Sequence, residues 1–340
     1  MRVLVIGGTG FIGAPVVHDL DAGGHEVAVF HRGLTETPLP SHVVHIRGDR
    51  ADIRDYTAAF KQFAPDVVVD ITPMVEAEAR AAVDAVRAVG RGGAAPRFVA
   101  VSSMDVYLTY GRLHGTESGA PVPTPLTEES SLRSVHYPYR GKVPGLERYE
   151  KILVERVVMS APDVDGVVVR LPMVYGPRDR QCRLFDDLKR MDDGRPAILL
   201  PEGLADWRAS RGYVDDCAHA VVLAATHPRA RGRIFHVAEP EALSQEAWIR
   251  AIAEAAGWSG RIVRVPEDLL PPAWRSPIDP HHHWEANSSR IRAELGFRED
   301  LPRFQALQRT IAWQRQHPPA IDARRFDYRL EDKVLARVAS

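Results

Sequence analysis

Glycines at fixed spacing near the amino terminus form a candidate phosphate-binding loop. The segment Gly7-Gly8-Thr9-Gly10-Phe11-Ile12-Gly13 follows a short apolar run and leads into a helical pattern that ends near Leu20. Glycine permits a tight turn, a close approach of the backbone to a pyrophosphate and close packing of a helix on a strand. The amino end of that helix offers unpaired N–H groups and a positive dipole end to phosphate. This context predicts a dinucleotide site with contacts from Gly7, Thr9, Gly10, Phe11, Ile12 and Gly13.

The residues after the second predicted strand bear on which dinucleotide binds. An acidic residue at this position would bind the free 2′-hydroxyl of NAD. The chain instead has His31-Arg32 directly after the strand Glu26–Phe30. A guanidinium forms bidentate, charge-assisted hydrogen bonds with a 2′-phosphate. The sequence therefore predicts NADP as the cofactor, held by Arg32, with NAD as the alternative.

Alternating strands and helices must position these residues. Short apolar runs, typical of strands buried on both faces, alternate with helical patterns from the amino terminus onward. Such βαβ units predict the α/β class, a Rossmann-type doubly wound parallel sheet. We expect residues 1–175 to form this dinucleotide-binding domain, with 213–240 returning to it. A smaller α/β substrate lobe is predicted for 176–212 and 241–317, followed by a polar tail at 318–340.

The composition disfavours several classes of protein. The 340 residues carry a net charge of −1, without the basic excess typical of nucleic-acid binders. No apolar run approaches the roughly 20 residues of a membrane helix, and the start at Met1 does not resemble a signal peptide. Two cysteines without motif spacing, Cys182 and Cys217, fit a reducing cytoplasm. The adjacent side chains of His281–His283 do not readily converge, so no metal site is predicted. We expect a cytoplasmic protein that binds a small molecule and forms a homodimer.

Further motifs identify a family. Five motifs occur in the order seen in the extended short-chain dehydrogenase/reductase family, the NAD-dependent epimerase/dehydratase group. They are Gly7–Gly13, Gly48-Asp49, Val101–Tyr107, Arg170–Pro177 and Tyr213–Asp216. The chain resembles this family over roughly residues 1–315. The resemblance implies an NAD(P)-dependent oxidoreductase, epimerase or dehydratase. Its substrate would present a carbinol or keto group and be small, whether sugar-like or nucleotide-linked.

The resemblance also assigns roles to individual residues. The position of Asp49 contacts adenine in the family, and the segment beginning at Arg170 closes over the nicotinamide. Ser103 matches the residue that hydrogen-bonds the reacting hydroxyl, and Lys151 matches the lysine that holds the nicotinamide ribose. The further cofactor contacts expected on this basis are Arg50, Thr72, Ser102, Pro172 and Val174.

The catalytic motif departs from the family pattern. The family places Tyr-x-x-x-Lys on one helix face, where the tyrosine exchanges a proton with the substrate. Here Glu147 stands four residues before Lys151, and Tyr149 lies two before it, about 200° round an ideal helix. Three readings stay open. Tyr149 could transfer the proton if the helix begins irregularly after Pro144-Gly145 and turns its side chain toward the substrate. A tyrosine from the preceding loop, Tyr137 or Tyr139, could take its place. Alternatively, a carboxylate, Glu147 or Asp105, could be the proton-transfer group.

The substrate side departs as well. Met173 stands where many sugar-nucleotide enzymes have asparagine, and Ala209 replaces an expected arginine. The substrate contacts predicted here are Tyr107, Tyr137, Tyr139, Arg140, Met173, Arg208 and Arg211. The rival hypothesis is a non-catalytic or regulatory dinucleotide-binding protein, favoured by the missing tyrosine. The retained Ser103 and Lys151 favour an enzyme.

Overall fold

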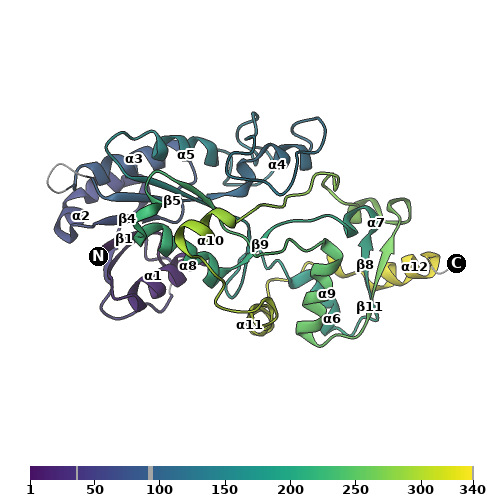
Figure 1. Cartoon of the computed structure of the whole chain (residues 1–340). Helices are drawn as coiled ribbons and strands as arrows, with labels where there is room; N and C mark the ends of the chain where they lie inside the picture. The colour runs from purple at the N-terminus through teal and green to yellow at the C-terminus, as the bar shows by residue number, and fades with distance from the viewer. Residues whose placement is uncertain (36, 91–94, 339–340) are drawn as a thin grey trace.

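A seven-stranded parallel sheet forms the larger part of the molecule (Figure 1). The computed structural model describes residues 1–35, 37–90 and 95–338. The strand order is β10-β6-β5-β4-β1-β2-β3. The strands are β1 (Arg2–Ile6), β2 (Glu26–His31), β3 (Val44–Arg47), β4 (Val67–Asp70), β5 (Arg97–Ser103), β6 (Gly166–Leu171) and β10 (Ile234–His236). The predicted Rossmann-type sheet is confirmed. The order reverses between β1 and β4, which opens a crevice at the carboxyl ends of the strands.

Helices cover both faces of this sheet, so its strands are apolar throughout. Val3 and Val5 of β1 belong to one buried cluster, while Leu4 and Ile6 belong to the other, as the two-residue period of a strand requires. In Figure 1 one face carries α1 (Gly13–Ala22) and α8 (Val214–Thr226). The other face carries α2 (Thr57–Phe63), α3 (Glu76–Arg87) and α5 (Lys151–Met159).

A smaller lobe lies beyond the carboxyl ends of the strands (Figure 1). Its parallel strands β8 (Ala197–Pro201) and β11 (Arg261–Val265) pair with each other. The short pair β7 (Met173–Tyr175) and β9 (Arg211–Tyr213) connects the lobe to the main sheet. The remaining helices are α4 (Leu108–Leu113), α6 (Phe185–Asp192), α7 (Glu202–Ala205), α9 (Gln245–Ala256), α10 (Ser289–Leu295), α11 (Arg303–Gln316) and α12 (Tyr328–Val338). No helix within the described ranges has the length and apolar character to cross a bilayer.

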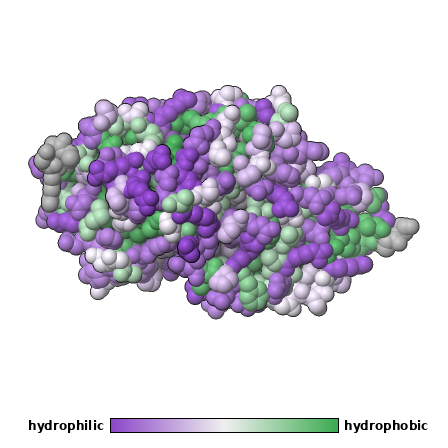
Figure 2. All heavy atoms as spheres, in the orientation of Figure 1, coloured by the Kyte–Doolittle hydropathy of each residue, from purple (hydrophilic) through white to green (hydrophobic). Residues whose placement is uncertain are grey.

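The carboxyl-terminal segment, expected as a polar tail, contains a helix that packs on the smaller lobe. Val334 of α12 packs against Val265 and Leu270. Glu331 is 2% exposed and forms an ion pair with Arg190, with 2.8 Å between Oε1 and Nε. Figure 2 shows polar side chains over most of the main domain and apolar side chains gathered at the end of the molecule where α12 packs. The partners of α12 are far away in sequence, so the local pattern did not reveal its packing.

Helix α5 begins three residues later than the sequence pattern predicts. The helical periodicity starts at Arg148, but Glu150 has φ −159° and ψ 96° and acts as the N-cap, accepting a hydrogen bond from Ile152 N over 3.0 Å. Its carboxylate is held by the buried guanidinium of Arg133, with 2.8 Å between Nη2 and Oε1. This ion pair pins the chain in an extended conformation just before the helix. Tyr149 therefore lies before the first turn of the helix, and the angle of about 200° from Lys151 that an ideal helix would impose does not apply to it.

Candidate active site

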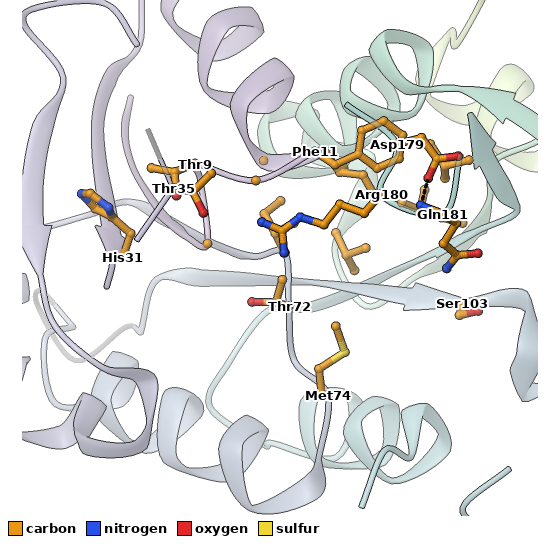
Figure 3. A pocket seen from close by; sticks show the side chains of 18 of the residues that line it. Thr9, Phe11, His31, Thr35, Thr72, Met74, Ser103, Asp179, Arg180 and Gln181 are labelled. Carbon is orange, nitrogen blue, oxygen red and sulfur yellow. Dashed lines mark hydrogen bonds between the residues drawn. The ribbon is translucent and has the colours of Figure 1, made fainter. Parts of the chain in front are cut away.

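A cleft of about 540 Å³ opens at the carboxyl ends of the central strands, next to the point where the strand order reverses (Figure 3). Its walls come from the glycine loop, the segments that follow β2 and β4, the end of β5, the start of α5, and the two segments that flank β7. Fourteen of the residues predicted from the sequence line it: Gly7, Thr9, Gly10, Phe11, Ile12, Gly13, Arg32, Thr72, Ser102, Ser103, Tyr149, Lys151, Pro172 and Val174.

The glycine loop has the geometry that a dinucleotide requires. Gly7 adopts φ +84°, a left-handed conformation that favours glycine. A Cβ atom on Gly13 would lie 2.2 Å from the carbonyl oxygen of Gly7, so only glycine allows α1 to pack this closely on the loop. A Cβ atom on Gly10 would meet nothing nearer than Gly7 O at 3.8 Å. Since Gly10 lines the cleft, that open space is available to a ligand. Within the described residues no side chain caps α1, which leaves its amino end for phosphate.

Ser103, Tyr149 and Lys151 all line the cleft, and Figure 3 shows Ser103 at one end of it. The Tyr149 hydroxyl donates a hydrogen bond to Asp105 Oδ2 over 2.7 Å. The Tyr139 hydroxyl donates to the same oxygen over 3.0 Å, although Tyr139 does not line the cleft. Ser103 Oγ accepts a hydrogen bond from Asp105 N over 3.1 Å. The structure thus brings Tyr149, Tyr139 and Asp105, three of the five proton-transfer candidates, into contact with one another.

Burial sets the protonation of this cluster. Asp105 is 1% exposed, and its Oδ1 atom has no hydrogen-bond partner among the described residues. Burial raises the pKa of Asp105, although the hydrogen bond from Tyr149 and the charge of Arg133 oppose this shift. Burial, followed by the charge of Asp105, raises the pKa of Tyr149 well above its usual value. Tyr149 is therefore a neutral phenol that donates protons, rather than a phenolate.

Lys151 lies beside this cluster without bonding the tyrosine hydroxyl. Its Nζ donates to the carbonyl oxygens of Val101 and Pro73, each over 2.9 Å, and lies 5.7 Å from the ring centroid of Tyr149. Burial lowers the pKa of Lys151 to about 8, although the charge of Asp105 opposes this shift. The ammonium group is thus held by one carbonyl oxygen of β5 and one of the segment after β4, and Lys151 lines the cleft.

The two remaining proton-transfer candidates lie outside this cleft. Glu147 is exposed, and its Oε1 accepts a hydrogen bond from Gly145 N over 3.0 Å within a turn. Tyr137 has φ +60°, and the exposed guanidinium of Arg140 stacks 4.0 Å from its ring centroid. Neither Tyr137 nor Arg140, both predicted to bind substrate, lines the cleft.

Tyr107 belongs to a network behind the cleft. Its side chain is fully buried, and its hydroxyl accepts from Arg170 Nη1 and bonds to the His236 ring. Arg170 also forms a 2.7 Å ion pair with Glu155, which accepts a hydrogen bond from Ser102 Oγ over 2.5 Å. This network links β5, β6, β10 and α5. The structure therefore places Tyr107 in the packing of the sheet and outside the lining of the cleft.

Asp49 and Arg50, predicted to contact the cofactor, do not line the cleft either. Arg50 Nη1 donates to Asp70 Oδ1 over 3.0 Å and to the carbonyl oxygen of Thr72 over 2.7 Å. Asp49 is exposed and caps the short helix at Arg50–Tyr56 by accepting from Ala51 N over 2.9 Å. Arg50 therefore positions Thr72, which does line the cleft.

The substrate contacts predicted in the smaller lobe also lie elsewhere. Arg211 is 5% exposed, donates to Gln245 Oε1 over 2.8 Å and stacks 4.4 Å from the ring centroid of Trp248. Burial lowers the pKa of Arg211 to about 10. Arg208 is exposed and donates to the carbonyl oxygen of Ala242, while Met173 packs in an apolar cluster. None of these three residues lines the cleft.

Several lining residues were not found from the sequence. They are His31, Gly33, Leu34, Thr35, Ile71, Met74, Val101, Leu171, Asp179, Arg180, Gln181 and Arg183. The group at 179–183 follows directly on the segment at Arg170–Pro177, which the family resemblance places over the nicotinamide. Its position in the chain was the signal that could have revealed it. No group of three or more His, Cys, Asp or Glu side chains in the described ranges is placed to hold a metal ion.

The parallel sheet, its glycine loop and the polar cluster beside the cleft define a dinucleotide-binding enzyme. The model of the NAD dependent epimerase/dehydratase family matches residues 3–238, and the chain belongs to this family. The family confirms the prediction of an NAD(P)-dependent enzyme of the epimerase, dehydratase or reductase type.

Relatives and solved structures agree with this assignment. The 2′-dehydrokanamycin reductase of Streptomyces kanamyceticus is 31% identical, with 79% of this chain and 70% of that protein covered. A 3-diazoavenalumate denitrifying reductase from a Streptomyces species is also 31% identical, over 76% of this chain and 82% of the relative. The UDP-glucose 4-epimerase of Thermus thermophilus in complex with NAD has a similar fold, with a TM-score of 0.66, 23% identity and coverage of 93% of this chain and 100% of that one.

Proposed function

We propose that this enzyme is an NADPH-dependent reductase of a ketone on a small, sugar-like substrate. The observation that carries the proposal is that Ser103, Tyr149 and Lys151 line the same cleft as the glycine loop. When bound there, the nicotinamide would supply a hydride to the carbonyl carbon. Ser103 would hold the carbonyl oxygen by a hydrogen bond, and Tyr149 would donate a proton to that oxygen.

Asp105 supports this direction of proton transfer. Its burial raises its pKa, which shifts Asp105 toward the carboxylic acid relative to an exposed aspartate. When Asp105 is protonated, its O–H can donate to the Tyr149 oxygen across their 2.7 Å contact, so that a proton passed from Tyr149 to substrate is replaced from Asp105. Tyr139, at 3.0 Å from the same oxygen, connects Asp105 onward to the Tyr110 hydroxyl, another 3.0 Å away. In this proposal Lys151 anchors the cofactor and does not lower the pKa of the tyrosine.

Charges at the end of β2 support NADP over NAD. His31 and Arg32 line the cleft there, and His31 Nε2 lies 2.9 Å from His45 Nδ1. Burial lowers the pKa of His31, and the charges of His45 and Arg47 lower it further. Asp179 is the sole carboxylate among the described lining residues, and it is paired with Arg183 at 2.9 Å. The lowered pKa keeps His31 neutral near pH 7, so the guanidinium of Arg32 supplies the positive charge for a 2′-phosphate, and no described acid lines this end to bind a 2′-hydroxyl.

The engaged arginines of the smaller lobe argue against a nucleotide-linked substrate. Arg211 is buried and bonded to Gln245, and Arg208 is bonded to a backbone carbonyl, so neither offers a free guanidinium to a diphosphate in this cleft. The two relatives at 31% identity are named as reductases, one of them for an oxidised kanamycin. We therefore favour a keto sugar without a nucleotide.

The test is NADPH oxidation against a panel of free keto sugars and their nucleotide-linked counterparts. Turnover of free keto sugars by the wild-type enzyme, with loss of turnover in Tyr149→Phe, would support the proposal. Turnover of nucleotide-linked substrates alone would contradict the substrate class. Binding of NADPH without oxidation across the whole panel would reject the reductase assignment and favour the non-catalytic rival.

A further inference from the structure

The loop between β7 and α6 is held rigidly over the cleft. Asp179 is 1% exposed and organises the loop, accepting from the backbone N–H groups of Gln181 over 3.0 Å and Arg183 over 3.2 Å. Arg183 also donates to the carbonyl oxygen of Val174 over 2.7 Å, which ties the loop to β7. Arg178 and Cys182 adopt left-handed conformations, with φ +71° and +47°. Strained backbone of this kind persists where the surroundings fix it and is concentrated at functional sites.

This rigid loop presents one free guanidinium to the cleft. Arg180 is exposed and lines the cleft, and its side chain makes no hydrogen bond or ion pair with any residue that the structure describes. In Figure 3 it extends over the middle of the cleft toward Thr72, between the end marked by His31 and Thr35 and the end marked by Ser103. Its neighbour Arg183 is tied to the protein through Nη1, which donates to Val174 O and Asp179 Oδ1, so the two arginines differ in role.

The position along the cleft identifies the chemical group that Arg180 would meet. A dinucleotide that runs from Arg32, at its adenosine ribose, to Ser103, at its nicotinamide, places its diphosphate bridge midway. The glycine loop covers one side of that bridge with N–H groups. We propose that Arg180 binds the diphosphate from the opposite side and thereby fastens the bound dinucleotide between the main domain and the smaller lobe. This inference rests on the proposed dinucleotide site but not on the choice between NADP and NAD.

The proposal can be tested by measuring how substitution of each of two arginines changes the affinity for each of two cofactors. NADP⁺ and NAD⁺ share the diphosphate, whereas the 2′-phosphate occurs in NADP⁺ alone. Titration calorimetry of both cofactors on wild type, Arg180→Gln and Arg32→Gln separates the two charges. Arg180→Gln should weaken both cofactors by the same factor, about 10- to 100-fold, as expected for a hydrogen-bonded charge. Arg32→Gln should weaken NADP⁺ alone, and the two effects on NADP⁺ should multiply in the double variant because the sites are separate.

A matched control lies in the same loop. Arg178→Gln removes an equal charge two residues away from Arg180, but Arg178 lines a different cavity, beside Pro177 and Asp215. It should leave both affinities within about twofold of wild type. Arg180→Lys should retain part of the affinity, because a lysine keeps the charge without the bidentate geometry. High salt should weaken wild-type binding more than it weakens binding to Arg180→Gln.

Each outcome decides between assignments. Loss of NADP⁺ affinity alone in Arg180→Gln would place Arg180 at the 2′-phosphate and overturn the proposal. Unchanged affinity for both cofactors in Arg180→Gln would also overturn it. An equal loss in Arg178→Gln would show that the effect is one of general charge. If wild-type protein binds neither cofactor, the proposed function itself fails, and that result is distinct from a failure of Arg180 alone.

Discussion

At the scale of single residues, the candidate active site couples a phenol to a buried carboxyl group rather than to an ammonium group. The Tyr149 hydroxyl donates to Asp105 over 2.7 Å, while Lys151 donates to two backbone carbonyls. A neutral phenol next to a carboxyl group whose pKa is raised by burial is suited to giving a proton to a developing alkoxide. Reduction of a ketone is the reaction that needs such a proton.

Tyr149→Phe tests the proton donor directly. Removal of the hydroxyl should lower kcat for ketone reduction by about 10²- to 10⁴-fold, the range of general acid catalysis. The Kd for NADPH should change by less than about twofold, since the ring and its packing remain. Tyr137→Phe is the matched control, because its ring lies outside the cleft against Arg140, and it should keep wild-type turnover. Equal activity of the two variants would remove Tyr149 from the mechanism.

Asp105→Asn tests the proposed proton reserve. Reduction by the wild-type enzyme should slow as the pH rises through the raised pKa of Asp105, because the carboxylate can no longer replace the proton of Tyr149. The amide has no ionisable proton, so the variant should be slow at all pH values and lack this limb. The measurement is a pH profile of kcat for both proteins. A variant that keeps the wild-type profile would exclude Asp105 as the source.

The lowered pKa of Lys151 predicts a pH dependence of cofactor binding. With a pKa of about 8, the side chain is charged below pH 8 and neutral above it. The affinity for NADP⁺ should therefore fall by roughly 3- to 10-fold between pH 7 and pH 9, as one attractive charge is lost. Lys151→Met should bind more weakly at pH 7 and show a flat profile. Arg32→Ala should keep the slope, and if Lys151→Met keeps it too, another group is responsible.

At the scale of elements, substitutions at different glycines of the loop from β1 to α1 should affect either cofactor binding or folding stability. Gly10→Ala should leave the melting temperature near that of wild type, because its Cβ atom meets no atom closer than 3.8 Å. The same methyl group enters the space of the diphosphate, so the affinity for NADP⁺ should fall at least about tenfold.

Gly13→Ala is the matched counterpart within the same loop. Its Cβ atom would lie 2.2 Å from Gly7 O, so the free energy of unfolding should fall by about 2–3 kcal/mol. Thermal and chemical denaturation measure the stability of both variants. If Gly10→Ala binds NADP⁺ as tightly as wild type does, the loop serves only as a turn.

At the scale of the whole molecule, α12 ties the end of the chain to the smaller lobe. Val334→Ala removes contacts with Val265 and Leu270 and should lower the free energy of unfolding by roughly 1–3 kcal/mol. Lys333→Ala, at the exposed neighbouring position, should change it by less than about 0.5 kcal/mol. The affinity for NADP⁺ should be unchanged in both, because α12 does not line the cleft. Equal stability of the two variants would show that α12 contributes no packing.

Features that depend on local spacing along the chain could be predicted before the structure was known. The glycines at positions 7, 10 and 13 and the apolar run before them predict a strand, a turn and a helix, because each requirement acts within one βαβ unit. The continuous apolar strands likewise predict a sheet covered on both faces. Fourteen of the predicted residues line the cleft for this reason, since the carboxyl ends of parallel strands meet at one edge.

The contacts between polar side chains depend instead on how the chain folds. Tyr149 reaches the cleft because Arg133, 17 residues before Glu150, holds that residue extended and delays the start of α5. Asp105 becomes its partner across 44 positions of sequence. Arg50 is drawn away from the cleft by Asp70, and Arg180 is left free because Arg183 satisfies Asp179. Such pairings depend on burial and on charges brought together by folding, which residue spacing along the chain does not encode.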